Sequence, residues 1–249
     1  MSYGLPKLGL AVIAMLIAIA PVSAAESPAS RPATTAPAKE SWPTIFSDLS
    51  SADLQTREAA RTALMRLNRA DLPELREIVA KARPIRPAQA AALHDIVQEI
   101  FLAGEKFEVS PGLGFLGVIM DEADSQIDVV QENDLHRAMG VIVCDRFPGF
   151  CAARNLVTGD IILGIASPFT PFRSRLDLTG AVGGLKPGTV VRLVILRRGQ
   201  VITLTLTLDH HPADSLLQDG GVSFRAERQR KFDAYWLANF KPLLSQQLG

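Results

Sequence analysis

The hydrophobic residues change their spacing near Gly104, and this change constrains the fold more than any other feature of the sequence. Before Gly104, apolar residues recur every three or four positions, which is the period of a helix with one buried face. After Gly104, short apolar runs alternate with turn residues, which is typical of β-strands. The sequence therefore predicts a helical segment followed by a segment that contains a sheet, an α+β organisation.

The helical pattern covers residues 42–106, where Ser50 and Ser51 are candidate caps of the first helix. This arrangement resembles a HEAT-type hairpin, but one and a half units are too few for a solenoid, which needs at least three repeats. We therefore expect a small helical cap or spacer. Its helices are predicted over residues 53–68, 72–82 and 88–103.

The first 25 residues carry the pattern of a secretory signal peptide. Lys7 precedes an uncharged run over residues 8–20, and small residues follow at the expected cleavage position near Ala24 or Ala25. The run is shorter than the about 20 residues that a bilayer core requires, although an uncleaved anchor helix is the alternative. We expect an exported protein, periplasmic or secreted, that meets the membrane only through the signal peptide before cleavage.

Residues 26–41 consist mainly of Pro, Ala, Ser and Thr, so they have little to bury and are expected to form a disordered linker. If segments 42–106 and 107–212 are separate domains, a fragment that begins near Phe107 should remain folded.

The strand-like region is divided by turn residues into short runs. Thr203, Thr205 and Thr207 alternate with leucines, as in a half-buried strand, and Arg198-Gly199 is a predicted hairpin turn. Two short helices are expected in the gaps. The predicted strands lie within 115–120, 127–130, 141–144, 161–165, 190–196 and 201–208, and the helices lie near 151–155 and 176–183.

Four segments of this region, in order, resemble a bacterial PDZ domain of the type attached to periplasmic trypsin-like serine proteases. They are Gly114–Val118; Gly140–Val143 with Phe147-Pro148-Gly149 and Ala152-Ala153; Leu156–Ile162; and Leu185–Gly188 with the hairpin 190–208. The resemblance implies a small PDZ-like, partly open β-barrel or sheet with two short helices over residues 107–212, without the protease domain.

The sequence departs from the family pattern in three places. Asn155 directly precedes Leu156, where the family usually has Ala-Gly, and residues 169–175 replace the usual Asn-Gly turn. An additional acidic stretch covers residues 121–134.

The resemblance also implies a binding site. An extended peptide can add a strand to an open sheet edge, and clustered backbone amides can hold its C-terminal carboxylate. The amides of Leu116, Gly117 and Val118 would bind the carboxylate, and a helix would provide the wall of an apolar pocket. We expect the partner to be a protein or peptide C-terminus with a hydrophobic last residue. The candidate residues are Phe115, Leu116, Gly117, Val118, Ile119, Leu178, Ala181 and Val182.

The sequence offers no pattern for catalysis, metal or nucleic-acid binding. Lys and Arg number 26 and so do Asp and Glu, so the basic excess typical of nucleic-acid binders is missing. The four histidines form no metal-ligand spacing, two cysteines cannot complete a zinc site, and no Gly-x-Ser-x-Gly motif occurs. We expect a non-enzymatic protein without a cofactor.

Two other functions stay open. The PDZ-like unit could have lost its ligand and serve as a structural part of an assembly, or the chain could be an accessory subunit of a periplasmic protease. The C-terminal extension, residues 213–249, is relevant to the structural role in an assembly. Its predicted helix over 224–244 has an aromatic stripe that could pack on another subunit or on its own domain. The stripe consists of Phe232, Tyr235, Trp236 and Phe240.

The two cysteines, Cys144 and Cys151, lie on either side of the Phe147-Pro148-Gly149 turn. An exported protein meets oxidising conditions, so they could form a disulfide, but we favour free thiols because of the geometry that a disulfide requires.

Overall fold

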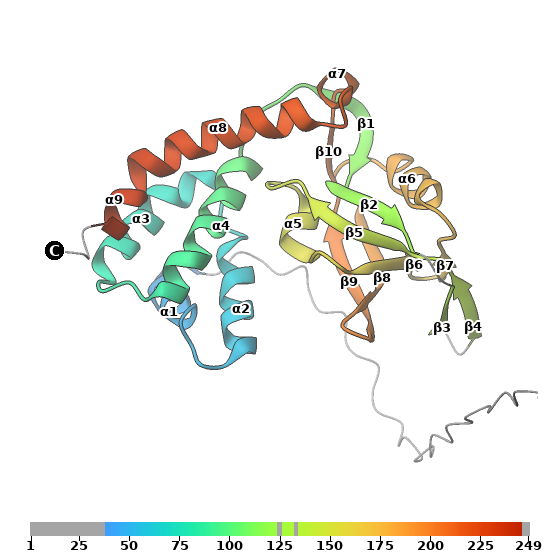
Figure 1. The fold of residues 1–249 in the computed structure, drawn as a ribbon, viewed down its shortest axis with the longest axis horizontal. Helices are drawn as coiled ribbons and strands as arrows, with labels where there is room; N and C mark the ends of the chain where they lie inside the picture. The colour runs from blue at the N-terminus through green and yellow to red at the C-terminus, as the bar shows by residue number, and fades with distance from the viewer. Residues whose placement is uncertain (1–37, 124–125, 132–133, 246–249) are drawn as a thin grey trace, which may run out of the picture. The chain divides into compact units, whose positions relative to one another are not determined.

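A computed structural model describes residues 38–123, 126–131 and 134–245 (Figure 1). These residues form helices and open sheets, with no closed barrel among the described strands, which confirms the α+β class. The predicted signal peptide and most of the predicted linker lie outside the described residues.

The N-terminal helices lie close to their predicted positions, with one addition at the start. They are α1 (Trp42–Asp48), α2 (Leu54–Leu64), α3 (Leu72–Lys81) and α4 (Pro87–Ala103), with 3-10 turns at Lys39–Ser41 and Arg69–Asp71. The interpretation of Ser50 and Ser51 as caps is wrong. Asp53 is the N-cap of α2, because its carboxylate accepts a hydrogen bond from the Thr56 amide at 2.8 Å.

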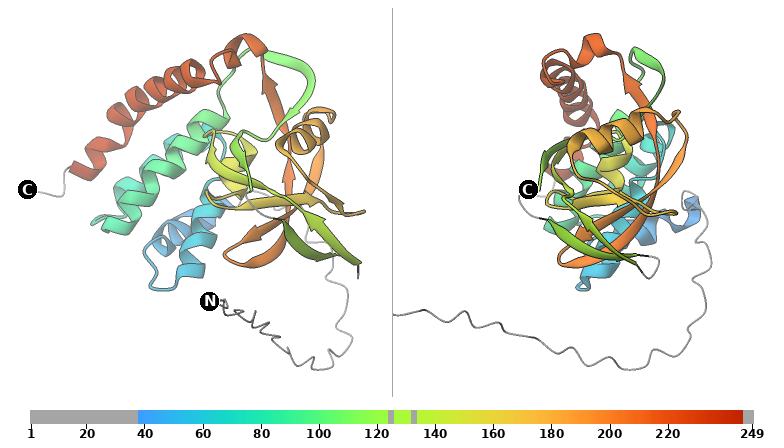
Figure 2. Two further views of the ribbon diagram at one scale, coloured as in Figure 1. Left: turned by 45° about the vertical axis from the view of Figure 1, so that its right-hand side comes forward. Right: turned by 90° about the vertical axis from the view of Figure 1, so that its right-hand side faces the viewer.

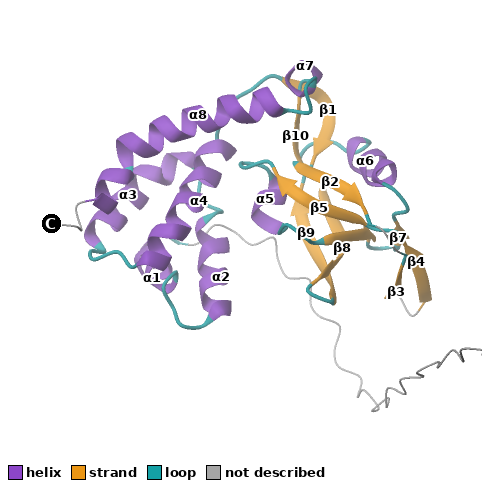
Figure 3. Cartoon of the chain, in the orientation of Figure 1, coloured by secondary structure: helices purple, strands orange, loops and turns teal. Residues whose placement is uncertain are grey.

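Three further helices follow the strands: α7 (Asp214–Leu217), α8 (Val222–Asn239) and α9 (Lys241–Ser245). Figure 3 shows α8 packed beside the N-terminal helices. Phe232 and Phe240 are fully buried in one hydrophobic cluster with Trp42, Phe46 and Ile100. The aromatic stripe of the C-terminal helix therefore packs on the helical segment of its own chain.

The main sheet is antiparallel and has the strand order β2-β5-β6-β8-β9, with β7 paired to β6. Its strands are β2 (Val118–Glu122), β5 (Val141–Arg146), β6 (Ile161–Ile165), β7 (Thr170–Pro171), β8 (Val190–Arg197) and β9 (Gln200–Thr207). Two ribbons accompany it: β1 (Val109–Phe115) with β10 (Asp209–Pro212), and β3 (Ile127–Gln131) with β4 (Asp134–Ala138). The short helices are α5 (Cys151–Asn155) and α6 (Arg175–Gly183).

The single strand predicted over residues 115–120 is in fact two strands, because the chain leaves β1 after Phe115 and enters β2 at Val118. Gly117 has φ +77°, a conformation that interrupts a strand and favours glycine. The acidic stretch 121–134 supplies the end of β2 and all of β3.

The turn before β6 forms despite the departure at Asn155. Asp160 is 1% exposed and accepts hydrogen bonds from the Arg197 guanidinium, at 2.8 and 2.7 Å, and from the Val157 amide at 2.8 Å. Arg197 also donates to the Asn155 carbonyl at 2.9 Å. An ion pair between buried Asp160 and half-buried Arg197 thus fixes the end of α5 against the sheet.

Candidate functional site

Strand β2 lies at the edge of the main sheet, with β5 on one side only. The Phe147 amide donates to the Gly117 carbonyl at 2.8 Å, and the Ala123 amide donates to the Gly140 carbonyl at 3.4 Å. In an antiparallel ladder these two bonds determine which residues face the neighbouring strand. The residues whose backbone groups face away from β5, toward the open edge, are Val118, Met120 and Glu122.

The loop that leads into β2 has its carbonyls turned inward. The Leu116 carbonyl accepts from the Ala152 amide at 3.0 Å, and the Gly117 carbonyl accepts from the Phe147 amide. The amides of Leu116 and Gly117 donate to no acceptor within the described part of the chain. Successive free amides beside a glycine form a concave site that can bind an anion.

Helix α6 lies close to β1 and β2 (Figures 1 and 2). Leu178 and Val182 on this helix are 1% and 5% exposed, and Ala181 is half-buried. They belong to the same apolar cluster as buried Leu116 and half-buried Val118. The structure therefore brings five of the eight predicted site residues together between the start of β2 and α6.

Phe115 and Ile119 lie in a different apolar cluster, which also contains Phe147 and Phe150. The Phe115 ring packs edge-to-face on Phe150, with a centroid distance of 5.0 Å. These two predicted residues thus support the loop from behind, and their side chains do not join the α6 cluster.

Gly117, the remaining predicted residue, connects the loop to this second cluster. A Cβ at this position would lie 2.5 Å from the Phe150 Cβ, which is closer than real Cβ contacts. Glycine is required here both for the positive φ and for the approach of Phe150.

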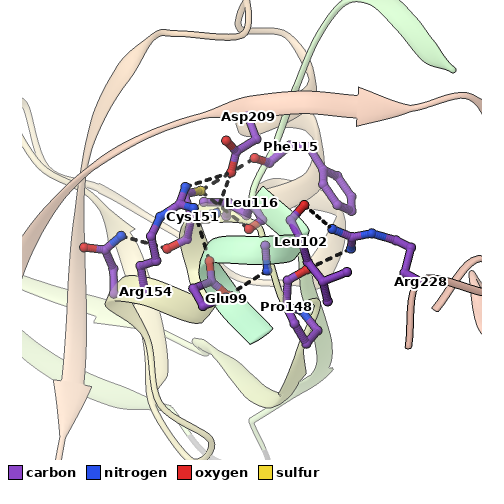
Figure 4. A network of polar contacts seen from close by, with 11 residues as sticks. Glu99, Leu102, Phe115, Leu116, Pro148, Cys151, Arg154, Asp209 and Arg228 are labelled. Atoms are coloured by element: carbon purple, nitrogen blue, oxygen red, sulfur yellow. Dashed lines mark hydrogen bonds and ion pairs between the residues drawn. The ribbon is translucent and has the colours of Figure 1, made fainter. Parts of the chain in front are cut away.

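A buried polar network lies behind the loop (Figure 4). The Glu99 carboxylate, 3% exposed, accepts from the Gly149 amide at 2.6 Å and from Arg154 at 3.1 Å. Arg154 also pairs with Asp209 at 3.5 Å, and Asp209 accepts from the Cys151 amide. The network joins α4, α5 and β10 at one place.

Burial controls the ionisation of this network. Burial raises the pKa of Glu99 to about 7, against the opposing effects of Arg154 and the Gly149 amide. Burial also raises the pKa of Asp209, and it raises the pKa of the Cys151 thiol to about 12. Cys151 is therefore protonated at neutral pH and is a poor nucleophile, while Cys144 is an exposed free thiol.

Arg228 of α8 completes the region and is 2% exposed. It donates to Glu105 at 2.9 Å, to the Pro148 carbonyl at 2.8 Å and to the Leu102 carbonyl at 2.9 Å. Its guanidinium also lies 4.8 Å from the centre of the Phe150 ring. With these partners Arg228 is a structural residue with little capacity left for a ligand.

Sequence reasoning missed this network entirely. Its members come from parts of the chain separated by 50 to 126 residues, so no local spacing connects them. The only signal was the Phe147-Pro148-Gly149 turn, which the sequence indicates as a turn without indicating its charged partners.

The described ranges offer no other kind of site. No group of three metal-ligating side chains occurs there, and no helix there is long and apolar enough to cross a membrane. His94 lies on α4 and packs edge-on against Phe232 and Trp236.

No protein-family model matches this chain. The chain is similar to curated proteins named "probable periplasmic serine endoprotease DegP-like". The protein from Pseudomonas fulva is 34% identical over 102 residues, which are 41% of this chain and 20% of that protein. The one from Pseudomonas putida (strain F1) is 31% identical over 116 residues, 46% of this chain and 24% of that protein. A solved structure of the HtrA-type protease AlgW with a decapeptide is 26% identical, with a TM-score of 0.30, and covers 49% of this chain and 35% of that one.

The chain thus spans only about a fifth to a quarter of the length of the curated relatives it matches. The curated relatives are named as DegP-like periplasmic serine endoproteases, and they match slightly less than half of this chain. Their location confirms the exported, periplasmic location expected from the sequence.

Proposed function

We propose that this chain is a non-catalytic, PDZ-like binding module that captures the hydrophobic C-terminus of a periplasmic polypeptide by strand addition to β2. One observation carries the proposal. The open edge of β2 begins at two amides without acceptors in the described part of the chain, and α6 lies beside it with an apolar wall.

Each part of the site corresponds to one part of such a ligand. The outward backbone groups of Val118 and Met120 would pair with an extended peptide, since strand addition uses main-chain hydrogen bonds. The amides of Leu116 and Gly117 would bind the terminal carboxylate, because hydrogen bonds to a charged acceptor are the stronger kind. Half-buried Val118 and Ala181 would contact the last side chain, which favours an apolar residue.

The relatives support a polypeptide partner. Endoproteases act on polypeptides, and this chain shares with them a segment of 102 to 116 residues. We expect an affinity of roughly micromolar, since a short peptide loses much conformational freedom for a small contact area.

The test is a library of decapeptides with varied C-terminal residues, screened against the full chain by fluorescence anisotropy. Peptides that end in apolar residues should bind, and amidation of their C-terminus should weaken binding about tenfold or more, because it removes the charge that the amides hold. The proposal fails if no peptide binds, or if amidation has no effect. The PDZ-like unit would then be a structural part of an assembly.

A matched pair of variants localises the binding to α6. Ala181→Asp places a charge in the half-buried wall, whereas Thr179→Asp places the same charge at an exposed position of the same helix. Only the first should abolish binding of apolar peptides. Val182, also a candidate site residue, is less suitable for this test. It is 5% exposed, so a charge there would destabilise the core as well as the site.

A further inference from the structure

The turn Phe147–Ala152 lies directly behind the loop that precedes β2. The amides of Phe147 and Ala152, at the two ends of the turn, donate to the carbonyls of Gly117 and Leu116 at 2.8 and 3.0 Å. Between them, the Phe150 side chain packs against Gly117. The turn therefore fixes the two peptide units that join Leu116 to Gly117 and Gly117 to Val118, and with them the outward-facing amides of Gly117 and Val118.

The helices hold the same turn from its other side. The Gly149 amide donates to Glu99 of α4 at 2.6 Å, and the Pro148 carbonyl accepts from Arg228 of α8 at 2.8 Å. Gly149 has φ +86°, and a Cβ there would lie 2.5 Å from the backbone of Leu102 at the end of α4. The turn backbone and the end of α4 are in direct contact.

The remaining part of the turn is held through charge. Arg154 bridges Glu99 and Asp209, and Asp209 accepts from the Cys151 amide (Figure 4). Hydrogen bonds with a charged partner are stronger than neutral ones, and they are stronger still when water is excluded. Glu99 is almost fully excluded from water, so its loss would leave the Gly149 amide and Arg154 without an essential partner.

We propose that Glu99 and Arg228 are positioning residues for the carboxylate-binding loop: through the turn Phe147–Ala152, the helices hold the Gly117 and Val118 amides in the geometry that binds a peptide end. This inference rests on the proposed function. It assigns to the helices a part in peptide affinity, beyond that of a spacer or cap.

A purely structural role for Glu99 makes a different prediction. A residue that only joins the helices to the sheet would lower the overall stability and would expose all core amides alike. A positioning residue loosens the bonds of the turn more than those of the rest of the sheet. Gln89 is the matched control, because it is a buried polar residue of the same helix that does not contact the turn.

Gln89 also lies on α4 and is 5% exposed, but its side chain donates to the Phe46 carbonyl at 3.1 Å and accepts from the Arg86 amide at 2.9 Å. It does not face the turn. Glu99→Ala and Gln89→Ala therefore each remove one buried polar side chain from the same helix, at different ends.

The first measurement is native-state hydrogen exchange on the full chain by NMR, which needs no ligand. The exchange rates of the Phe147 and Ala152 amides are divided by those of the β8 amides, which report opening of the sheet as a whole. Glu99→Ala should raise this ratio about tenfold, equivalent to about 1.4 kcal/mol. Gln89→Ala should leave the ratio at its wild-type value. Glu99→Gln keeps an oxygen that can accept from the Gly149 amide, so its ratio should lie close to that of the wild type.

The second measurement is binding of a fluorescein-labelled decapeptide that ends in valine with a free carboxylate. Glu99→Ala should weaken its binding about tenfold, and Gln89→Ala should not, since only Glu99 contacts the turn. Arg228→Met, which keeps the apolar stem over the aromatic rings, should weaken binding in the same way as Glu99→Ala. If Glu99→Ala does not fold, the comparison of Arg228→Met with wild type decides the question.

The two measurements separate the two proposals. If the wild type binds no decapeptide, the proposed function fails, while the exchange ratio still shows whether the helices hold the turn. If peptides bind but Glu99→Ala leaves the exchange ratio and the affinity unchanged, the positioning role is wrong and the peptide site stands. An equal effect of Gln89→Ala on the ratio would also overturn the positioning role.

Discussion

Gly117 shows how one backbone position can serve the loop and the core together. Its positive φ directs the chain from β1 into β2, and the absence of a side chain admits Phe150. The resemblance placed Gly117 in a loop, whereas the apolar pattern alone indicated one strand over residues 115–120. The second requirement depends on Phe150, 33 positions later, and became visible only in the structure.

We predict that Gly117→Ala lowers the free energy of unfolding by about 1–3 kcal/mol and also weakens peptide binding, because the alanine Cβ meets Phe150 at a positive φ. Gly180 on α6 is the control. A Cβ there meets no atom within 4 Å, so Gly180→Ala should raise the stability by up to about 1 kcal/mol. Urea unfolding of both variants measures the difference. Equal stabilities would show that Phe150 moves aside without cost.

Glu99 should make the stability depend on pH. Its pKa in the folded protein, about 7, is above the ordinary 4.5 of a glutamate, so the folded state binds more protons than the unfolded state between these values. The stability contributed by this group is therefore complete below about pH 4.5 and is lost as the pH rises through about 7, by about 3 kcal/mol in total.

Glu99→Gln should remove this dependence. Thermal unfolding of wild type and variant at pH 5 and pH 8 gives the difference between the two proteins, in which the contributions of distant titrating groups largely cancel. A difference that does not change with pH would show that Glu99 is ionised throughout.

At the scale of elements, α8 belongs to the helical core although the whole sheet separates it from α4 in sequence. We predict that Phe232→Ala costs about 3–5 kcal/mol, because the ring is fully buried and leaves a cavity. Leu237 lies on the same helix and is 53% exposed, so Leu237→Ala should change the stability by less than about 0.5 kcal/mol. Chemical denaturation compares the two. Similar losses would mean that α8 detaches from the core in solution.

The sequence predicted the elements that carry a regular apolar pattern and missed those that do not. α3 and α4, with their buried faces, and β8 and β9, with their alternating residues, lie close to where periodicity placed them. β4 (Asp134–Ala138) and β10 (Asp209–Pro212) are mostly polar and pair in narrow ribbons, so they carry no such pattern. Their pairing follows from the tertiary arrangement alone.

At the scale of the molecule, the helices and the sheet are connected by Glu99, Arg228 and the turn between them, and α8 shares its core with the N-terminal helices. We predict that the full chain unfolds in one transition. Both tryptophans, Trp42 and Trp236, lie in the helical cluster, so their fluorescence reports the helices, and the NMR amide signals of β8 report the sheet. Coincident transitions would support this prediction.

Removal of residues 1–106 tests the same prediction more strictly. A fragment 107–249 would expose Phe232 and Phe240 on α8 and would leave Arg228 without Leu102 and Glu105, so it should be less stable and prone to associate. A fragment 107–212 with the same unfolding midpoint as the full chain would instead establish the independent modules that the sequence suggested.

The candidate site was predictable only in part, for a physical reason. The loop and the α6 wall consist of neighbouring residues whose local pattern resembles a known module, and the structure brings Leu116, Val118 and Leu178 into one cluster. The support behind the loop consists of charged residues from four separate elements, and single charged residues in a sequence do not indicate their partners. Resemblance therefore grouped residues that the structure brings together, but it gave no indication of the charged side chains behind the loop.

The open edge of β2 has a consequence for the behaviour of the protein at high concentration. An unpaired strand that can accept a peptide can equally accept the same strand of another copy, which is a common route to aggregation. This edge is only five residues long and ends in two exposed carboxylates, Asp121 and Glu122, both of which disfavour extended pairing. Neutralising these carboxylates would make the edge more prone to pair with another copy, and it would leave the loop unchanged. A short, acidic strand is therefore one way to keep an edge open for the proposed peptide while disfavouring self-association in the periplasm.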